Sequence, residues 1–141
     1  MPLSRRTTYN IGLIQAQAYR NLQALFRSAL EEFKLTIPEW TLLGLVYEHN
    51  AMSLKELTES MKSKASHPTI LVNQLAARGL VERTASPLDQ RMKQVRLTSA
   101  GRDLVVQAEG KVKQTIITAL SGVDREVLER YFTVLLAISQ L

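Results

Sequence analysis

Residues 81–101 of the chain read VERTASPLDQRMKQVRLTSAG. Val81–Ala85 can form one strand, and Lys93–Leu97 can form a second because polar and apolar side chains alternate along it. Residues 86–89 lie between the two runs and are typical of turns. Thr98 follows the second run directly and can cap a helix. The segment therefore predicts a β-hairpin with a polar tip that passes straight into a helix.

Helical patterns flank this hairpin on both sides. Over residues 8–34, apolar side chains recur about every 3.6 residues, as on one face of an amphipathic helix. Further helices are predicted over residues 38–49, 53–61, 66–78 and 98–120, with a last helix capped by Ser121. The side chains expected to face inward include Trp40, Leu43 and Tyr47 in the second helix and Val127, Leu128, Tyr131, Leu135 and Ile138 in the last.

The middle of the chain has the element order of a winged helix-turn-helix. Ser53 and Glu56 have the capping-box spacing that opens a short helix. Pro68 suits the first turn of the next helix, and Gly79 suits the position just after its end. With the hairpin as the wing, residues 36–98 form a unit whose second helix can enter a DNA major groove. The expected fold is mainly α-helical with a small β-hairpin wing.

The helices at the two ends carry more apolar surface than this unit can cover. We expect residues 8–34 and 98–141 to pair with a second copy of the chain, so that all 141 residues form a single domain with dimerisation helices. A bundle within one chain is the alternative. A two-fold dimer that carries two groove-reading helices predicts a palindromic DNA site, with half-sites about one helical turn apart.

Basic charge is concentrated in one segment. The chain has a formal net charge of +5. Residues 61–102 hold eight Lys and Arg against two Asp and Glu, whereas the remainder holds ten bases and eleven acids. A basic segment beside a groove-reading helix favours a polyanion such as double-stranded DNA as the partner.

Composition also argues against several classes of function. The sequence contains no cysteine, which excludes disulfides, thiolate ligands, thiol nucleophiles and thiol-oxidation switches. Its two histidines, His49 and His67, have no acidic cluster around them, so no metal site or cofactor is expected. No catalytic constellation stands out, so we do not expect an enzyme. No apolar run approaches the roughly 18 residues of a membrane span, and the start lacks a secretory signal, so we expect a cytoplasmic protein without a membrane partner.

Five short motifs follow one another along the chain. They are Leu35-Thr36-Ile37-Pro38-Glu39-Trp40, Leu54-Lys55-Glu56-Leu57, Leu75-Ala76-Ala77-Arg78-Gly79-Leu80-Val81-Glu82-Arg83, Asp89-Gln90-Arg91 with Val95-Arg96-Leu97-Thr98-Ser99-Ala100-Gly101, and Leu120-Ser121 with Glu126. Their order and spacing resemble the MarR family of bacterial transcriptional regulators over almost the whole chain. The fourth motif is the most specific, because it is similar to the wing signature of that family.

This resemblance implies a homodimer with recognition helices in successive major grooves and wing tips at the flanking minor grooves. It also implies a repressor that releases DNA when a small ligand, often aromatic or phenolic, binds between the dimer and DNA-binding regions. The chain departs from the family pattern at Ile70, where many relatives carry an arginine, and at Pro68, which relatives often place two residues earlier. Base specificity is therefore not carried over.

The expected recognition helix turns one polar face away from the core. The candidate DNA contacts on it are Ser66, His67, Thr69, Ile70, Asn73 and Gln74. An Asn or Gln side chain can read adenine through two hydrogen bonds, and Ile70 can meet a thymine methyl group. The first residues of the helix can also bind phosphate through their backbone amides. A merely solvated face is the alternative interpretation.

The turn before this helix and the wing after it supply the expected phosphate and minor-groove contacts. These residues are Lys62, Lys64, Gln90, Arg91, Lys93 and Arg96. Arg91, at the wing tip, is the expected minor-groove or phosphate contact. We expect Asp89 to hold the wing in shape rather than touch DNA, because its charge repels phosphate.

Three residues are candidates for a small-molecule effector pocket between the first and second helices: Tyr19, Arg20 and Trp40. For Trp40, a place in the core is the favoured interpretation over a role in the pocket. The sequence thus predicts a dimeric, sequence-specific DNA-binding regulator, a repressor released by a ligand. A winged-helix dimer that acts through protein contacts alone is the alternative, and the basic segment argues against it.

Overall fold

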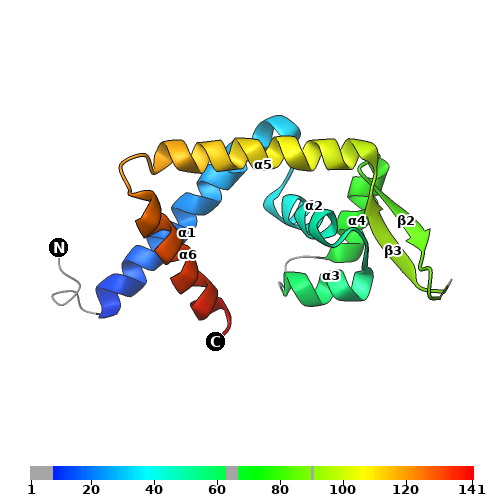
Figure 1. Cartoon of the computed structure of the whole chain (residues 1–141), viewed down its shortest axis with the longest axis horizontal. Coiled ribbons are helices and arrows are strands. Elements are labelled where there is room, and N and C mark those ends of the chain that lie inside the picture. The colour runs from blue at the N-terminus through cyan, green and yellow to red at the C-terminus, as the bar shows by residue number, and fades with distance from the viewer. Residues whose placement is uncertain (1–7, 63–66, 90) are drawn as a thin grey trace.

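The computed structural model describes residues 8–62, 67–89 and 91–141, which form an arch (Figure 1). The helix α5 (Ser99–Ala119) runs along the arch from one end to the other. At one end, residues 8–21 of α1 (Thr8–Leu30) and the helix α6 (Arg125–Ser139) descend as an arm. At the other end, residues 35–98 form the winged lobe. The lobe contains α2 (Ile37–His49), β1 (Met52–Ser53), α3 (Leu54–Met61), α4 (Pro68–Ala77), β2 (Val81–Ala85) and β3 (Lys93–Leu97).

The core lies within the winged lobe and where α1 and α5 pack on it. Its buried residues are Ala29, Leu30, Leu35, Leu42, Leu43, Val46, Met52, Leu57, Leu71, Val72, Leu75, Leu80, Val81, Val95, Leu97, Val105, Ala108 and Val112. Burial of a Leu or Val side chain stabilises the fold by about 1.5–3 kcal/mol. The last turn before the lobe is the short 3-10 helix η2 (Glu31–Phe33), which ends at Lys34 in a left-handed conformation (φ 52°).

The predicted hairpin is confirmed, and a third strand adds to it. The strands β2 and β3 are antiparallel, and Val81 pairs with Leu97 while Arg83 pairs with Val95. The short strand β1 lies on the other side of β3, which gives the order β1-β3-β2. The sequence did not reveal β1, because two residues are too few for a periodic pattern, and the capping signal of Ser53 dominates there.

A tight junction joins the end of α4 to the start of α5. Thr98 donates its hydroxyl to the Gly79 carbonyl oxygen at 2.6 Å, and its own backbone N–H to that of Leu80 at 3.1 Å. A Cβ atom on Gly101 would lie 2.0 Å from the carbonyl oxygen of Leu80. Only glycine lets the first turn of α5 approach this backbone. The Thr98-to-Gly101 pattern therefore fixes where the wing returns to the body of the protein.

Two expectations about the helices require correction, one about the inward face of α2 and one about the cap of the last helix. In α2, Leu43 is fully buried and the half-buried Trp40 packs against the core, as predicted, and Leu42 and Val46 are fully buried as well. Tyr47, in contrast, is 40% exposed. The helix α2 packs against α1, α4, α5 and β3, so its buried sector is wider than one stripe and turned away from Tyr47. The predicted cap of the last helix is also wrong. Asp124 caps α6 in place of Ser121, and its carboxylate accepts the Glu126 N–H at 3.0 Å.

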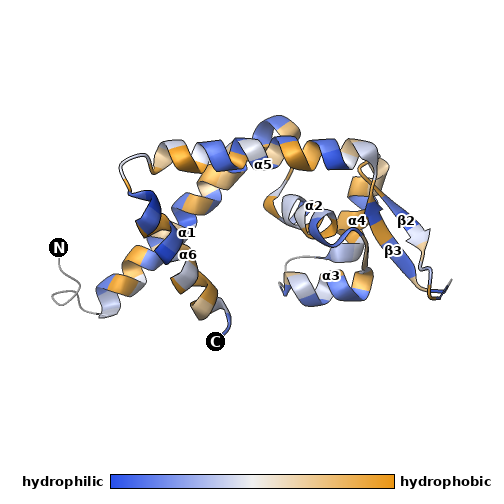
Figure 2. Ribbon diagram, in the orientation of Figure 1, coloured by the Kyte–Doolittle hydropathy of each residue, from blue (hydrophilic) through white to orange (hydrophobic). Residues whose placement is uncertain are grey.

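The apolar residues of the arm lie on its surface, and the prediction that they face inward is wrong for the single chain. No residue of α6, which is described in full, is buried. Phe132 is 66% exposed, Leu135 is 40% exposed, and Ile14 in α1 is 52% exposed. Figure 2 shows hydrophobic residues on both helices of the arm. Among the described helices, none is long and apolar enough to span a membrane.

Candidate nucleic-acid interface

The polar face of α4 points into solvent. Leu71, Val72 and Leu75 attach the helix to the core, and the opposite face carries the predicted DNA contacts Thr69, Ile70, Asn73 and Gln74, all exposed. His67 is the N-cap residue of α4 and is exposed, and its side chain makes no capping hydrogen bond. Ser66 and Lys64 lie outside the described residues. The described part of the predicted set thus forms one continuous strip along α4.

One residue of this strip contacts the wing. Arg83 of β2 donates a hydrogen bond from Nη2 to Oδ1 of Asn73 at 2.7 Å. The sequence prediction included Asn73 but not Arg83, which was only counted among the bases. No local pattern pairs these two residues. The contact depends on how the hairpin packs beside α4.

The wing tip is shaped by Asp89. Its carboxylate Oδ1 accepts the backbone N–H of Arg91 at 2.9 Å, and its carbonyl oxygen accepts that of Met92 at 3.0 Å. Ser86 closes the base of the loop by donating its backbone N–H to the Met92 carbonyl at 2.8 Å. The side chain of Arg91 is exposed beyond this loop. Gln90 lies outside the described residues.

The two wing-stem bases lie on opposite faces of the hairpin. Lys93 pairs with Ala85 and shares the face of buried Val95, whereas Arg96 pairs with Glu82 on the outer face. The structure therefore does not bring Lys93 and Arg96 to one surface. Lys93 and Arg96 can contact the same DNA strand only if that strand runs along the edge of the hairpin.

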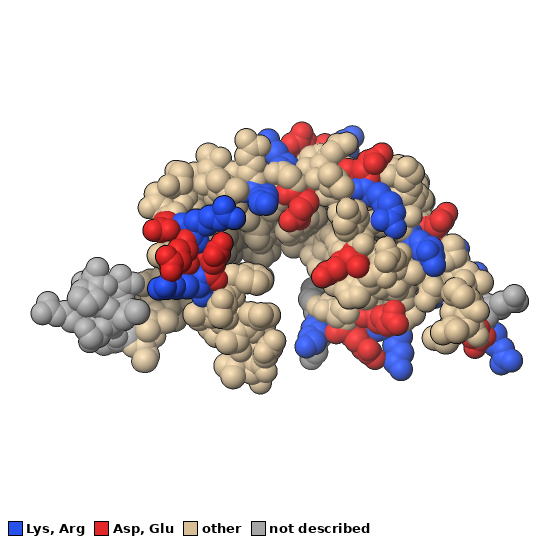
Figure 3. All heavy atoms as spheres, viewed as in Figure 1, with Lys and Arg blue, Asp and Glu red and all other residues tan. Residues whose placement is uncertain are grey.

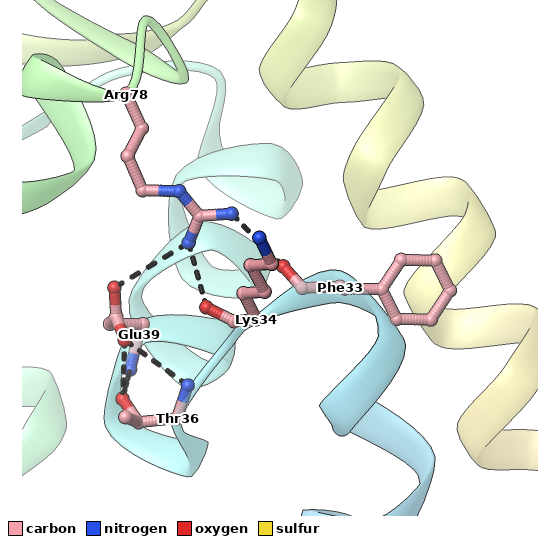
Figure 4. A network of polar contacts seen from close by, with 5 residues as sticks. All are labelled: Phe33, Lys34, Thr36, Glu39 and Arg78. Carbon is pink, nitrogen blue, oxygen red and sulfur yellow. Dashed lines mark hydrogen bonds and ion pairs between the residues drawn. The ribbon is translucent and has the colours of Figure 1, made fainter.

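Two further bases of the basic segment, besides Arg83, bind protein groups. Arg78 donates to the carbonyl oxygens of Lys34 and Phe33 at 2.9 Å each, and its guanidinium lies 3.9 Å from the carboxylate of Glu39 (Figure 4). Arg102 lies 5.9 Å from the centre of the Tyr47 ring, which is a cation–π distance. Both contribute to the internal structure of the lobe. The charge available to DNA is smaller than the sequence count indicates.

The remaining bases are spread along the outer edge of the lobe. Figure 3 shows Lys and Arg side chains at the wing tip and along the edge that carries α3, with acidic side chains between them. Lys62, at the C-cap of α3, is exposed in a left-handed conformation (φ 48°). It is the last described residue before the segment that connects α3 to α4. Lys62 and Arg91 thus stand before and after the exposed strip of α4 in the chain.

Two exposed apolar residues at the wing tip were missed by the sequence reading. Leu88 is 98% exposed and Met92 is 53% exposed. They flank the Asp89 turn, and apolar side chains in this kind of position can contact sugars or base edges in a minor groove. Their signal in the sequence was weak, because isolated exposed apolar residues are common on protein surfaces.

A cleft of about 570 Å³ opens between α1, α2 and α3. Its lining residues are Tyr19, Gln23, Arg27, Leu35, Thr36, Ile37, Pro38, Thr41 and Met61. Tyr19 is among the predicted pocket residues. Arg20 is turned toward Gln17, to which it donates a hydrogen bond at 2.7 Å, and Trp40 packs against Phe26 with ring centres 5.4 Å apart. Neither of these two lines the cleft.

The predicted pocket residues did not include Gln23 and Arg27, although the spacing of these residues from Tyr19 indicates a shared helix face. Tyr19, Gln23 and Arg27 lie four residues apart and so share one face of α1. The cleft combines an aromatic ring, apolar walls and one guanidinium.

Within the described residues, no group of three or more His, Cys, Asp or Glu is placed to hold a metal ion.

Comparison with known proteins identifies relatives of this architecture. The model of the MarR family matches residues 35–93, which span most of the winged lobe. The transcriptional regulator FarR of Neisseria gonorrhoeae is 31% identical over 101 residues, which cover 72% of this chain and 68% of FarR. The transcriptional repressor IacR of Pseudomonas putida is 24% identical over 122 residues, covering 86% and 71% of the two chains.

Solved structures share the whole fold. BpsR of Bordetella bronchiseptica, described for regulation of its DNA binding by 6-hydroxynicotinic acid, superposes with a TM-score of 0.80 at 22% identity and covers 100% of this chain and 98% of its own. CouR of Rhodococcus jostii, solved with p-coumaroyl-CoA, gives a TM-score of 0.81 at 24% identity over 95% and 94% of the two chains. At these identities the likeness shows the fold alone.

Proposed function

Since this chain belongs to the MarR family of transcriptional regulators, we propose that it binds DNA as a homodimer and acts as a repressor that a small ligand releases. The proposal includes DNA contacts from α4 and the wing, a palindromic operator and no catalytic activity. The observation that carries it is the strip of exposed side chains on α4, which stands beside a wing whose tip presents Arg91 to solvent.

The arm supports the homodimer. Its helices expose Ile14, Tyr131, Phe132 and Leu135, and exposed apolar area of this extent is typical of a surface that another chain covers. A second copy supplies the matching surface by symmetry, since a two-fold interface uses the same patch on both subunits. Two copies joined through their arms carry two α4 helices, one for each half of a palindromic site.

The DNA-binding proposal is tested with two matched arginine substitutions. Labelled duplex DNA is titrated with wild type, with Arg91→Ala and with Arg125→Ala over a range of salt concentrations. Arg125, at the start of α6, is 92% exposed and pairs with Glu129 of its own helix. Its loss therefore removes the same charge from outside the proposed DNA interface. Arg91→Ala is expected to weaken binding and to reduce the salt slope by about 1, whereas Arg125→Ala leaves both unchanged.

Equal binding by Arg91→Ala and wild type would show that the wing tip does not contact DNA. No binding of wild-type protein at any salt concentration would favour the alternative, a winged-helix dimer that acts through protein contacts alone. The basic segment argues against that alternative, because residues 61–102 hold eight Lys and Arg against two Asp and Glu, and a surface that binds only protein gains nothing from this excess.

For the effector, we propose an aromatic acid held in the cleft by Arg27, with its ring beside Tyr19. BpsR responds to 6-hydroxynicotinic acid and CouR binds p-coumaroyl-CoA; both compounds contain an aromatic ring, and the first also carries a free carboxylate. A guanidinium pairs strongly with a carboxylate through two parallel hydrogen bonds.

The effector proposal is tested by thermal unfolding with a panel of aromatic acids that includes benzoate, 4-hydroxybenzoate and 6-hydroxynicotinate. At least one acid is expected to raise the Tm of wild type and of Arg20→Met, but not of Arg27→Met. Arg20 provides the control because it lies on the same helix and does not line the cleft. A Tm shift retained in Arg27→Met would contradict the proposed role of that guanidinium.

A further inference from the structure

Arg83 is placed to hold Asn73 because of the register of the hairpin. Val81 and Arg83 lie on the same face of β2, and their partners across the strand pair, Leu97 and Val95, are both buried. This face of the hairpin covers the core and packs beside α4. Arg83 stands just beyond the buried part of the face, where its guanidinium reaches Asn73 at 2.7 Å.

The chemistry of the contact fixes which way the amide of Asn73 points. A guanidinium carries only hydrogen-bond donors, so the Asn73 atom that faces it must be the acceptor Oδ1. The amide nitrogen Nδ2, with its two N–H groups, is then turned away from Arg83. Asn73 is exposed on the same side of α4 as Ile70 and Gln74, so the group it offers to a partner is a donor.

We propose that Arg83 sets the polarity with which Asn73 reads a base, so that Asn73 selects guanine rather than adenine. This inference rests on the proposed function, because it requires α4 to lie in a major groove. An asparagine reads adenine by accepting from N6 and donating to N7, which uses both ends of the amide. In this chain Oδ1 is engaged by Arg83, and the adjacent cation also repels the positive hydrogens of an adenine amino group.

Guanine fits the arrangement that remains. Its major-groove edge presents two acceptors, N7 and O6, which match the two N–H groups of Nδ2. Within the described residues, no protein group occupies the amide of Gln74, which keeps both its acceptor and its donor available. Asn73 and Gln74 are adjacent amides on one helix, yet the contact with Arg83 gives them different recognition properties.

The test is selection of binding sites from a random duplex pool by wild type, Arg83→Met and Arg96→Met. Arg96 is the matched control, since it lies one position along the hairpin on the opposite face and has no bond to Asn73. Wild type is expected to favour guanine at one position of each half-site. Arg83→Met frees Oδ1, so the preference at that position is expected to move to adenine by about fivefold or more.

A second substitution reverses the polarity while keeping the bond to Arg83. In Asn73→Asp one carboxylate oxygen still accepts from Arg83, and the other faces DNA as an acceptor. The guanine preference is expected to disappear, and cytosine or adenine, which present amino groups in the major groove, is expected to replace it. Circular dichroism and the Tm of each variant establish that it is folded.

The outcomes separate this inference from the proposed function. If wild type selects no DNA sequence, the proposed function fails. If wild type selects a site and Arg83→Met changes only the affinity, as Arg96→Met is expected to do, then Arg83 is a phosphate contact or a structural tie and the inference is overturned. It is also overturned if wild type shows an adenine preference at the Asn73 position.

Discussion

The winged lobe and the arm are built from similar helical patterns but differ in where their apolar residues lie. In the lobe, residues such as Leu43, Leu57 and Leu75 are fully buried within one chain. In the arm, Tyr131 and Leu135 are at least 40% exposed, although they are spaced as regularly. The apolar residues of the lobe, together with those of α1 and α5 that pack on it, are therefore buried within one chain, whereas those of the arm are not. The α5 helix runs from the arm to the lobe and connects the two regions (Figure 1).

The largest expected effect is at the junction of α4 and α5 in the lobe. Gly101→Ala places a Cβ atom 2.0 Å from the Leu80 carbonyl oxygen, and relief requires backbone movement. We expect a loss of about 3 kcal/mol or more in the free energy of unfolding, measured by chemical denaturation. Gly110→Ala, on the same helix, meets nothing within 4 Å and is expected to stabilise the protein by up to about 1 kcal/mol. Equal effects would show that the junction is not tightly packed.

The arm should respond to a substitution that leaves the lobe intact. Leu135→Glu places a charge on the exposed apolar face of α6, and we expect it to weaken self-association by about 2 kcal/mol or more. Analytical ultracentrifugation measures the shift from dimer to monomer. Val106→Glu is the control, because Val106 is 59% exposed on α5 but borders α2 of the lobe. A variant Leu135→Glu that remained a dimer would remove α6 from the interface.

A smaller effect is expected where the lobe meets α1. Arg78→Met removes two hydrogen bonds to backbone carbonyls and leaves Glu39, which is 7% exposed, without its cation. We expect a loss of about 1–3 kcal/mol in the free energy of unfolding. The control is Lys111→Met, which breaks an exposed pair with Glu32 at 3.6 Å and should cost under about 1 kcal/mol. Similar losses in the two variants would contradict a clamp at Arg78.

The smallest expected effect concerns the wing tip. If Asp89 acts by shaping the loop, Asp89→Asn keeps the acceptor for the Arg91 N–H and should bind DNA at least as tightly as wild type. Asp89→Ala loses that acceptor and should bind more weakly by about 1 kcal/mol. Fluorescence anisotropy with one duplex compares the two. Binding by Asp89→Asn that is as weak as binding by Asp89→Ala would assign the role to the charge instead.

Much of the fold was predictable because its signals are local. The capping boxes at Thr36 and Ser53, the left-handed Gly79 and the alternation along β3 are each decided within a few residues. The strands β2 and β3 begin and end where the sequence indicated. Burial is different, because it depends on what packs against a stripe. The periodicity of α6 was correctly read as an apolar face, but nothing in that periodicity says whether the same chain covers it.

The candidate site shows the same division. The exposed strip of α4 followed from the helical period, since Leu71 and Leu75 fix the buried side. The partners of the basic residues could not be predicted from the helical period, because they lie far away in the sequence or on another element. Arg78 bonds to carbonyls 44 and 45 residues away, and Arg83 reaches across from a strand to a helix. Charge counts along a sequence therefore overestimate how many cations remain available to DNA.

In the proposed complex, two copies of this chain, joined through their arms, place two α4 helices on one DNA duplex. Selection of binding sites by the wild-type protein from a random duplex pool tests it most directly. We expect a two-fold symmetric consensus whose half-sites have centres about 10 base pairs apart, or a multiple of that spacing. An asymmetric consensus with a single half-site, or no enrichment of any sequence, would contradict it.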